Sequence, residues 1–492
     1  MDKRKAVPGA GPDASAELAT QADEENFSSK SGWSNLLSGA NGVRSLALAG
    51  GVALHAINVY IATTILPTVV RDIGGLDLYA WNTTIFVVAS ILGSALSTRL
   101  LQVTGPRGAY VLAASVFAAG AVVCAVSPTM PLMLIGRLIQ GIGGGFLFAL
   151  AYAMIRIVFD EALWPRAMAL VSGMWGVATL VGPAVGGIFA EWGVWRAAFW
   201  SVTLVAMLFA LLAVAVLPRK ERHPFQSLGT STPFLQLLLL TFTVIAISAG
   251  SASLDLTRNV LGIVIALVLA TLLVGAEARS RQKLLPSDAF RPASTIAALY
   301  AMMSLLVVTV TSGEVFAPLF LQVLHHQSPL IAGYLAALMA AGWTLGSITS
   351  SGATGRFIGH AIMAGPVLGL AGMVGLDVFV PKNGAGAWME LAPICLALVA
   401  IGFGVGLAWP HLLTRVLKAV PPHEQELAGA SITTIQLFAT ATGAALAGMV
   451  ANAGGLIDPG GVVGTAHAAR WLFGIFAIAP LFGVVVARRC RH

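Results

Sequence analysis

Residues 172–187 read SGMWGVATLVGPAVGG, an uncharged run in which five glycines and one proline interrupt the apolar residues. The glycines recur at helical spacing, at Gly173, Gly176, Gly182, Gly186 and Gly187. On a helix they would form one face without side chains, and small residues at such spacing let membrane helices approach closely. Pro183 removes a backbone donor and bends the helix. We therefore predict a bendable membrane-spanning helix whose smooth face moves against a neighbour.

This run lies in one of many apolar stretches that are long enough to cross a bilayer, which takes about 20 residues. Of the 492 residues, 57% are hydrophobic and only 10% are charged, too few polar groups for a soluble protein of this size. We predict an all-α polytopic membrane protein with fourteen spans, near residues 45–67, 79–98, 108–127, 131–155, 167–190, 197–217, 233–254, 259–276, 294–324, 329–352, 358–380, 388–413, 427–452 and 468–487.

Basic residues fall in alternate gaps between these spans. Of the 28 Lys and Arg residues, 22 lie before the first span, after each even-numbered span or at the end of the chain. Arg137 lies inside a span, and the opposite side holds only Arg71, Arg196, Arg258, Lys382 and, at the start of the last span, Arg470. Because cytoplasmic loops retain positive charge, we expect both termini to be cytoplasmic.

The same distribution accounts for the net charge of +7, so we do not expect nucleic-acid binding. The three cysteines, Cys124, Cys395 and Cys490, have no paired spacing and indicate neither a disulfide framework nor a metal site. The chain carries no phosphate-binding loop, zinc-binding helix motif or nucleophile elbow. We therefore expect neither an enzyme nor a cofactor.

The Gly-Pro-x-x-Gly-Gly run, followed by Trp192, Trp195, Arg196 and Phe199, resembles the antiporter signature of the major facilitator superfamily, in its branch of fourteen-helix drug:proton antiporters. The resemblance implies two pseudo-symmetric six-helix halves that rock about a central site, with two inserted helices between them. It divides the chain into an N-terminal half (41–217), a linker with two additional spans (218–293) and a C-terminal half (294–492).

Residues 1–40 are polar and lack the apolar core of a signal peptide, so we expect a disordered cytoplasmic tail. Within it, Trp33 to Leu37 fit either a linker or a short helix at the membrane surface.

Residues 134–145, LIGRLIQGIGGG, resemble the helix-4 motif of the family with its buried arginine. A charged side chain in lipid is costly unless it faces a cavity or a partner, so Arg137 is either a coupling residue or a structural arginine that binds carbonyl groups. Gln140 lies one turn further on the same face and could share its hydrogen bonds.

Residues 98–107, TRLLQVTGPR, are similar to the family's gating loop, and the gating residues expected here are Arg99, Gly105 and Arg107. The family's Asp is replaced by Gln102. The first span resembles the helix-1 signature of the branch at residues 58–67, NVYIATTILP, where Asn58 replaces an embedded Asp. Protons must then be carried elsewhere or not at all.

Two titratable groups lie well inside the spans and could carry protons. His55 lies one turn before Asn58 and could change charge near physiological pH. Glu314 lies inside span nine, where a carboxyl group removed from water can take up and release a proton. Repeat symmetry relates span nine to span one, so we expect Asn58 and Glu314 to face one cavity. Glu314 is the first candidate, with an ion-paired or permanently neutral structural role as the alternative.

Aromatic and polar residues on the helices that face the cavity are candidates for substrate contact: Asn58, Tyr60, Gln140, Trp175, Phe316, Gln322, Trp343 and Gln436. A wide apolar cavity with few fixed charges favours amphipathic or lipophilic molecules.

These features predict a monomeric, proton-coupled exporter of small amphipathic compounds in the inner membrane of a bacterium, with protons, the substrate and membrane lipids as its partners. Two alternatives remain. One is an uncoupled facilitator or importer of a neutral solute that hydrogen-bonds Asn58. The other is a membrane scaffold or lipid-handling protein that uses the two inserted spans.

Overall fold

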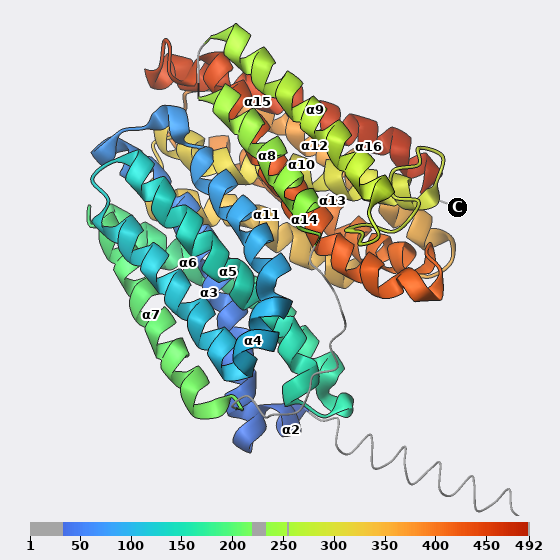
Figure 1. Cartoon of the computed structure of the whole chain (residues 1–492). Helices are drawn as coiled ribbons and strands as arrows, with labels where there is room; N and C mark the ends of the chain where they lie inside the picture. Colours follow the sequence, from blue (N-terminus) through green and yellow to red (C-terminus); the bar gives the residue numbers. More distant parts are fainter. Residues whose placement is uncertain (1–32, 219–232, 253–254, 491–492) are drawn as a thin grey trace, which may run out of the picture.

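The computed structural model describes residues 33–218, 233–252 and 255–490, and this part of the chain is built from helices without strands (Figure 1). Of the predicted tail at residues 1–40, residues 1–32 lie outside the described residues. The long helices are α3 (Gly39–Ile73), α4 (Trp81–Val126), α5 (Met130–Val158), α6 (Trp164–Glu191), α7 (Trp195–Val216), α8 (Phe234–Ser251), α9 (Leu256–Arg279), α10 (Thr295–Leu324), α11 (Pro329–Ser350), α12 (Arg356–Phe379), α13 (Trp388–Lys418), α14 (Gln425–Ala451), α15 (Gly461–Phe476) and α16 (Ile478–Arg489).

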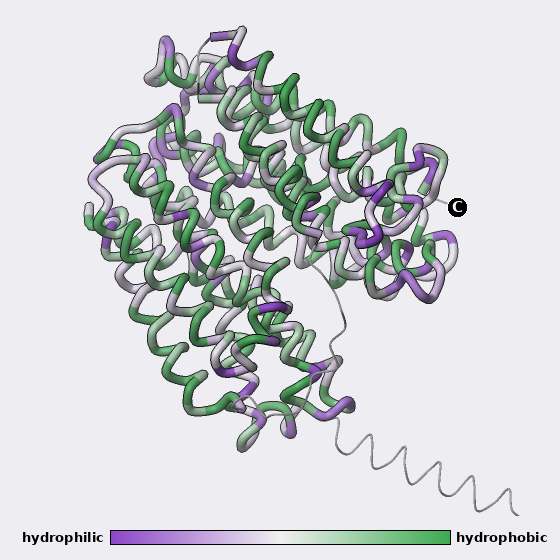
Figure 2. The backbone as a smooth tube through the Cα atoms, in the orientation of Figure 1, coloured by the Kyte–Doolittle hydropathy of each residue, from purple (hydrophilic) through white to green (hydrophobic). Residues whose placement is uncertain are grey.

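Short helices connect or precede these long ones. They are α2 (Trp33–Leu37), the 3₁₀ turns η1 (Leu76–Leu78), η2 (Glu161–Leu163) and η3 (Pro422–Glu424), and the π turn η4 (Asn452–Leu456). Hydrophobic residues run along the long helices, and hydrophilic residues gather at their ends and in the connections (Figure 2). This is the pattern expected of helices that cross a bilayer.

The predicted fourteen crossings are consistent with the structure. Among the described residues, 13 helical stretches are long and apolar enough to cross a membrane, and α15 and α16 together form the last of them. One stretch, Leu76–Val126, contains two of the predicted spans. Its helix α4 breaks at Gly105, whose φ of 73° is accessible to glycine at little cost. Pro106 then begins the second arm.

The two arms of α4 run in opposite directions, as their contacts with α5 demonstrate. In the first arm, Phe86 and Ser90 approach Gly141 and Gly145, so residue numbers rise together. In the second arm, Cys124 approaches Gly136 whereas Phe117 approaches Gly143, so the order is reversed. The prediction of two spans is therefore right, but a sharp break at one glycine replaces the expected gating loop at residues 98–107.

The long helices form two bundles (Figure 1). Helices α3–α7 pack on one another as an N-terminal bundle, and α10–α16 pack on one another as a C-terminal bundle. The inserted helices α8 and α9 pack together as a hairpin, in which α8 contacts both α4 and α14. The division of the chain at residues 41–217, 218–293 and 294–492 stays a prediction, because packing alone does not define its boundaries.

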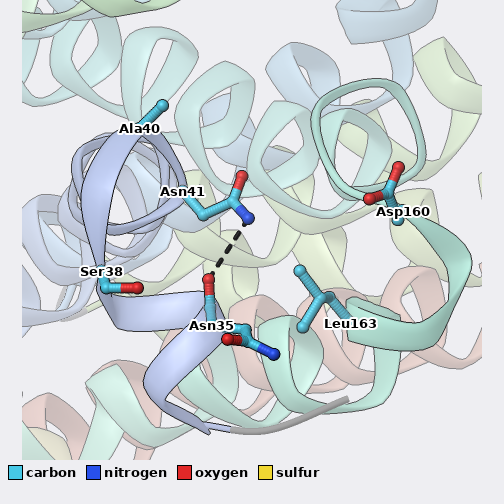
Figure 3. Close-up of a pocket in the computed structure, with 6 residues that line it drawn as sticks. All are labelled: Asn35, Ser38, Ala40, Asn41, Asp160 and Leu163. Atoms are coloured by element: carbon cyan, nitrogen blue, oxygen red, sulfur yellow. Dashed lines mark hydrogen bonds between the residues drawn. The ribbon is translucent and has the colours of Figure 1, made fainter. Parts of the chain in front are cut away.

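Helix α2 lies at the end of the N-terminal bundle where the chain begins. Leu36 is buried, whereas Trp33 and Leu37 are 47% and 55% exposed. Of the two interpretations of this segment, the structure therefore has the short helix, and the predicted tail stops short of residue 40. Beside α2, a small open pocket is lined by polar side chains that include Asn41, whose Nδ2 donates to Asn35 O at 3.2 Å (Figure 3).

Candidate functional site

The two bundles meet tightly at the end of the molecule that is distant from α2. There α6 packs on α11, and a Cβ atom on Gly187 would lie only 2.4 Å from Leu330 Cα. The Tyr334 hydroxyl of α11 donates to Leu180 O at 3.0 Å, and Leu330 N donates to Glu191 Oε1 at 3.3 Å. We call this end of the molecule the closed end.

A second contact at the closed end joins α14 to the start of α4. The Asn452 side chain donates both of its N–H groups, to Asp77 O at 3.1 Å and to Ser251 O at 2.8 Å. Asp77 belongs to the connection between α3 and α4, and Ser251 ends α8. One amide therefore ties the N-terminal bundle, the inserted hairpin and the C-terminal bundle together. Nearby, the ring of Tyr79 stacks on Phe316 with 5.2 Å between the centroids.

The bundles are apart at the opposite end, which we call the open end. On α6, Gly173 and Gly176 continue the face that carries Gly187, but a Cβ atom on either would have no heavy atom of another element within 4 Å. The neighbouring face of α11 carries Leu345 and Ile348, which are 54% and 66% exposed. The bundles are thus in close contact at the closed end, and the facing parts of α6 and α11 are uncovered toward the open end. We call the part of the interface between the two ends the central region.

Glu314 lies in this central region, where α10 of the C-terminal bundle approaches α3. Its partly buried carboxyl group interacts with the hydroxyl group of Tyr60 on α3. The Tyr60 ring is 7% exposed and packs on Ala178 and Trp175 of α6. Every other Asp or Glu in the long helices that the structure describes lies within about one turn of a helix end. Among the acidic residues of these described helices, Glu314 therefore lies farthest from a helix end.

The prediction that Asn58 and Glu314 face one cavity is not met in this conformation. Asn58 is fully buried, and its Oδ1 accepts a hydrogen bond from Gln140 Nε2 at 2.9 Å. Tyr60, two residues further along α3, takes the position facing Glu314. The repeat relationship identified the correct pair of helices but not the residue on α3.

Arg137 and Gln140 share the hydrogen-bond network that their spacing predicted. Arg137 Nη1 donates to Gln140 Oε1 at 2.7 Å, and Arg137 Nε donates to Asn82 O at 3.3 Å. The guanidinium carbon lies 4.0 Å from the centroid of the Phe86 ring. Arg137 is 2% exposed, and neither of the two salt bridges among the described residues involves it. Its partners are thus an amide, a carbonyl and an aromatic face.

His55 is buried among aromatic rings of the same bundle. Its ring centroid lies 5.2 Å from that of Phe86, 5.5 Å from Phe148 and 6.0 Å from Trp175. Gly144 permits this approach, because a Cβ atom there would lie 2.7 Å from His55 Nδ1. Among the described residues, Nδ1 has no hydrogen-bond partner. His55 is therefore close to Trp175 and to the central region, on the side of α3 that faces α5.

The other predicted cavity residues fall into two groups. Trp175, Trp343 and Gln436 are partly exposed, and Trp343 packs edge-on to Trp409 with centroids 5.1 Å apart. Phe316 is fully buried between Tyr79 and Phe320, and Gln322 is 5% exposed with neither amide atom hydrogen-bonded among the described residues. In this conformation the side chains of the first group are partly exposed, whereas those of the second group are covered.

The predicted glycine face of α6 is used in three different ways. Gly182 and Gly186 lie against α3, where a Cβ atom on Gly182 would be 2.4 Å from Tyr60 Cβ and one on Gly186 would be 3.0 Å from Ile61 O. Gly187 lies against α11, as does Pro183, which contacts the face around Gly333. Gly173 and Gly176 lie at the open end. At about 100° per residue, Gly182 and Gly186 lie on a different side of α6 from Gly173, Gly176 and Gly187, so the prediction of a single glycine face is wrong.

The predicted gating arginines differ in their contacts. Arg107 Nε donates to Leu217 O at 3.1 Å, and its backbone N donates to Pro218 O at 3.3 Å, so it ties the break in α4 to the end of α7. Arg99 is exposed. At the closed end, Arg196 and Trp195 of the signature both donate to Asp72 Oδ2, at 2.6 and 3.0 Å, and join α7 to α3.

Sequence reasoning missed Asn452 and Tyr334, which hold the closed end together. Each lies near the end of an apolar span, where a polar side chain is common and carries no signal of its own. The described residues contain no group of three or more His, Cys, Asp or Glu side chains that could hold a metal ion.

Comparison with known proteins agrees with this geometry. The family model described as Major Facilitator Superfamily matches residues 48–444. A probable multidrug-efflux transporter of Mycobacterium tuberculosis (strain H37Rv) is 36% identical over 474 residues, covering 95% of this chain and 98% of that protein.

Solved structures share the fold. A nucleoside transporter is 13% identical with a TM-score of 0.63, and the match covers 90% of this chain and 98% of that one. A bacterial homologue of the human lysosomal transporter Spinster, solved in an inward-facing and unoccupied conformation, is 16% identical with a TM-score of 0.60, and the match covers 92% and 96% of the two chains. With its all-helical fold and its two bundles around a central region, this chain is a transporter and belongs to the major facilitator superfamily.

Proposed function

We propose that this transporter exports small amphipathic or lipophilic compounds in exchange for protons, by alternating access. The observation that carries the proposal is the contact between Tyr60 and Glu314, a carboxyl group deep in a long helix at the interface of the two bundles. The similarity to a probable multidrug-efflux transporter supports the substrate class.

The position of Glu314 suits a proton carrier, because its environment must change when the bundles rock. An ionised carboxylate is costly away from water unless it has a partner, whereas the protonated form is neutral. In this conformation Glu314 is partly exposed toward the central region and has the Tyr60 hydroxyl beside it. Rocking of the bundles would separate α3 from α10 and change both the partner and the access of the carboxyl group. Proton uptake and release can then alternate between the two sides of the membrane.

Arg137 and His55 were predicted to take part in coupling, and their surroundings suggest different roles. The partners of Arg137 are the Gln140 amide, the Asn82 carbonyl and the Phe86 ring, so we propose that it fixes α4 against α5 rather than exchanging protons. His55, whose Nδ1 has no partner among the described residues, stays a second candidate.

We infer the substrate class from the partly exposed aromatic residues and from Glu314. Trp175 packs on the cluster that contains Tyr60, Trp343 of α11 is partly exposed, and Glu314 is the acidic group of the central region. Aromatic rings bind apolar bodies and, through their faces, cations. We propose amphipathic compounds with at most one charge.

Among the described residues, most Lys and Arg residues lie at the open end, and this excess supports an orientation with the open end and both termini in the cytoplasm. We propose that the protein acts as a monomer in the inner membrane, and that the structure is then the state that receives substrate from the cytoplasmic side.

Reconstitution in liposomes that enclose a pH-sensitive dye tests the proposal. With an imposed pH gradient, a panel of lipophilic cations and neutral amphipaths should include compounds that move against protons. Flux that does not respond to the gradient would instead indicate an uncoupled facilitator. Absence of flux for every compound would favour a scaffold or lipid-handling role.

A further inference from the structure

The two bundles border each other along two seams, and the inserted hairpin covers only one of them. The first seam runs between α6 and α11, and the second runs between α4 and α14. Helix α8 contacts both α4 and α14, whereas neither α8 nor α9 makes a comparable contact with α6 or α11 among the described residues. The two seams are therefore unlike.

Helix α8 bridges the second seam far from the closed end. Leu237 and Leu240 of α8 form a buried cluster with Ile91 of α4, and Leu437 and Phe438 of α14 pack against it. Leu437 precedes Asn452 by fifteen residues, which places it about 22 Å along α14 from the closed end at 1.5 Å per residue. At this depth the second seam is filled with apolar side chains.

The hairpin is also held at both of its ends. At the closed end, Asn452 Nδ2 donates to Ser251 O of α8 at 2.8 Å. At the open end, the segment that follows α9 is tied to the C-terminal bundle, because Ser287 N donates to Glu424 Oε2 at 3.2 Å. The hydrogen bond from the Ser287 side chain lowers the pKa of the Glu424 carboxyl group. The hairpin of α8 and α9 is thus fixed in place over the second seam.

The first seam is uncovered at a similar depth. Gly173 precedes Gly187 by fourteen residues, about 21 Å along α6, and a Cβ atom there would meet nothing within 4 Å. Val177 of α6 and Leu345 of α11 are 41% and 54% exposed beside it. Trp175 lies on the same segment of α6, and it packs on the cluster that contains Tyr60, whose hydroxyl faces Glu314. The uncovered stretch therefore continues the α6–α11 contact surface toward the open end and lies beside the central region.

We infer that α8 seals the α4–α14 seam, and that amphipathic substrate enters sideways from the membrane leaflet at the open end, through the uncovered α6–α11 seam. This inference rests on the proposed export function. It gives the inserted helices a role, which is to leave one lateral entrance instead of two. An amphipath that has partitioned into the leaflet would slide its apolar part between the helices and reach Trp175 first.

Photolabelling of the full-length protein in phosphatidylethanolamine and phosphatidylglycerol liposomes tests the route. The probe is an alkyl quaternary ammonium that carries a diazirine on its chain and that the wild type is first shown to transport. Specific labelling is the part that an excess of the unlabelled compound removes. We expect specific labelling to be about tenfold higher on the first seam, at residues 172–180 and 341–348, than on the second seam, at residues 91–96 and 433–438. Equal competed labelling at both seams, or labelling at the first seam that only lipid analogues compete away, would overturn the inference.

A variant that opens the sealed seam gives an independent test. Leu237→Ala combined with Leu240→Ala removes apolar contacts with Ile91, so competed labelling of residues 91–96 should rise about tenfold. The matched control is Leu261→Ala with Val264→Ala on α9, whose side chains are 55% and 48% exposed, and it should keep the wild-type pattern. An unchanged pattern in a Leu237/Leu240 variant that still transports would overturn the seal. Failure of the wild type to transport any probe would overturn the proposed function, and the route with it.

Discussion

The hydroxyl group of Tyr60 on α3 faces the carboxyl group of Glu314 on α10, across the interface between the two helical bundles. Glu314 has no basic partner, since neither salt bridge in the described part of the chain includes it. A proton-coupled transporter needs a group whose protonation and access change together, and a carboxyl group at a moving interface meets that need. The pair is therefore the centre of the proposed mechanism.

Tyr60→Phe should reduce proton-driven transport while keeping the fold. Removal of the hydroxyl group deprives the carboxyl group of its polar neighbour, so we expect the rate of proton-driven transport to fall by about tenfold, which corresponds to about 1.4 kcal/mol in the barrier. The ring should still pack on Ala178 and Trp175. Tyr334→Phe is the matched control, because the Tyr334 hydroxyl donates to a backbone carbonyl, Leu180 O, at the same interface. Equal losses in the two variants, measured as dye-reported flux, would remove the special role of the Tyr60–Glu314 contact.

Gly187→Ala should weaken the closed end. The added Cβ atom would lie 2.4 Å from the Leu330 backbone, so α6 and α11 must separate at an overpacking cost of about 1 to 3 kcal/mol. Gly173→Ala has open space and should be neutral or stabilising, because alanine favours helix over glycine by about 1 kcal/mol. Thermal unfolding in detergent compares the two variants. If the unfolding temperature of Gly187→Ala is equal to or higher than that of Gly173→Ala, the tight packing of Gly187 against Leu330 is contradicted.

Arg137→Lys should destabilise the N-terminal bundle. Lysine lacks the planar fork that reaches both Gln140 Oε1 and Asn82 O, so one buried acceptor loses its partner at a cost of about 1 to 3 kcal/mol. Arg99→Lys, at an exposed arginine, is the control and should leave stability unchanged. If Arg137→Lys keeps full stability but loses the dependence of transport on pH, Arg137 is a coupling residue and its proposed structural role is wrong.

Asn452→Asp should loosen the junction of the two bundles and the hairpin. The carboxylate keeps the shape of the amide but cannot donate a hydrogen bond to Asp77 O or Ser251 O. Its oxygen atoms would then face two buried carbonyl oxygens without a donor between them, which lowers the stability of the protein by about 1 to 3 kcal/mol. Asn41→Asp removes one exposed hydrogen bond to Asn35 O and should have little effect. Hydrogen exchange at the start of α4 and the end of α8 should increase only in the Asn452 variant. Unchanged hydrogen exchange in the Asn452 variant would show that the two hydrogen bonds of Asn452 are not needed to hold this junction together.

Much of the fold was predictable because each membrane span must satisfy its own backbone and present apolar side chains to lipid. Even the tight reversal within α4 was predictable, since Gly105 and Pro106 stand in the polar segment that separates two predicted spans. The network of Arg137 and Gln140 was likewise predictable, because positions one turn apart on a helix share a face.

The contacts between bundles were less predictable, because they depend on how each helix is rotated and on which conformation the molecule adopts. Repeat symmetry paired α3 with α10 but suggested Asn58 where the structure has Tyr60. The glycines of α6 recur within one run of the sequence, yet Gly182 packs on α3, Gly187 packs on Leu330 of α11 and Gly173 faces open space. The role of Asn452 depends on two carbonyl groups from distant segments, which no local pattern indicates.

The most direct test of proton coupling compares two assays on Glu314→Gln in liposomes, for a compound that the wild type transports. One assay measures uptake driven by an imposed pH gradient, and the other measures exchange of labelled for unlabelled compound without a gradient. If Glu314 carries the proton, the variant should lose gradient-driven uptake and substrate-dependent proton movement while exchange continues. Gradient-driven uptake that persists at the wild-type level in Glu314→Gln would contradict the account.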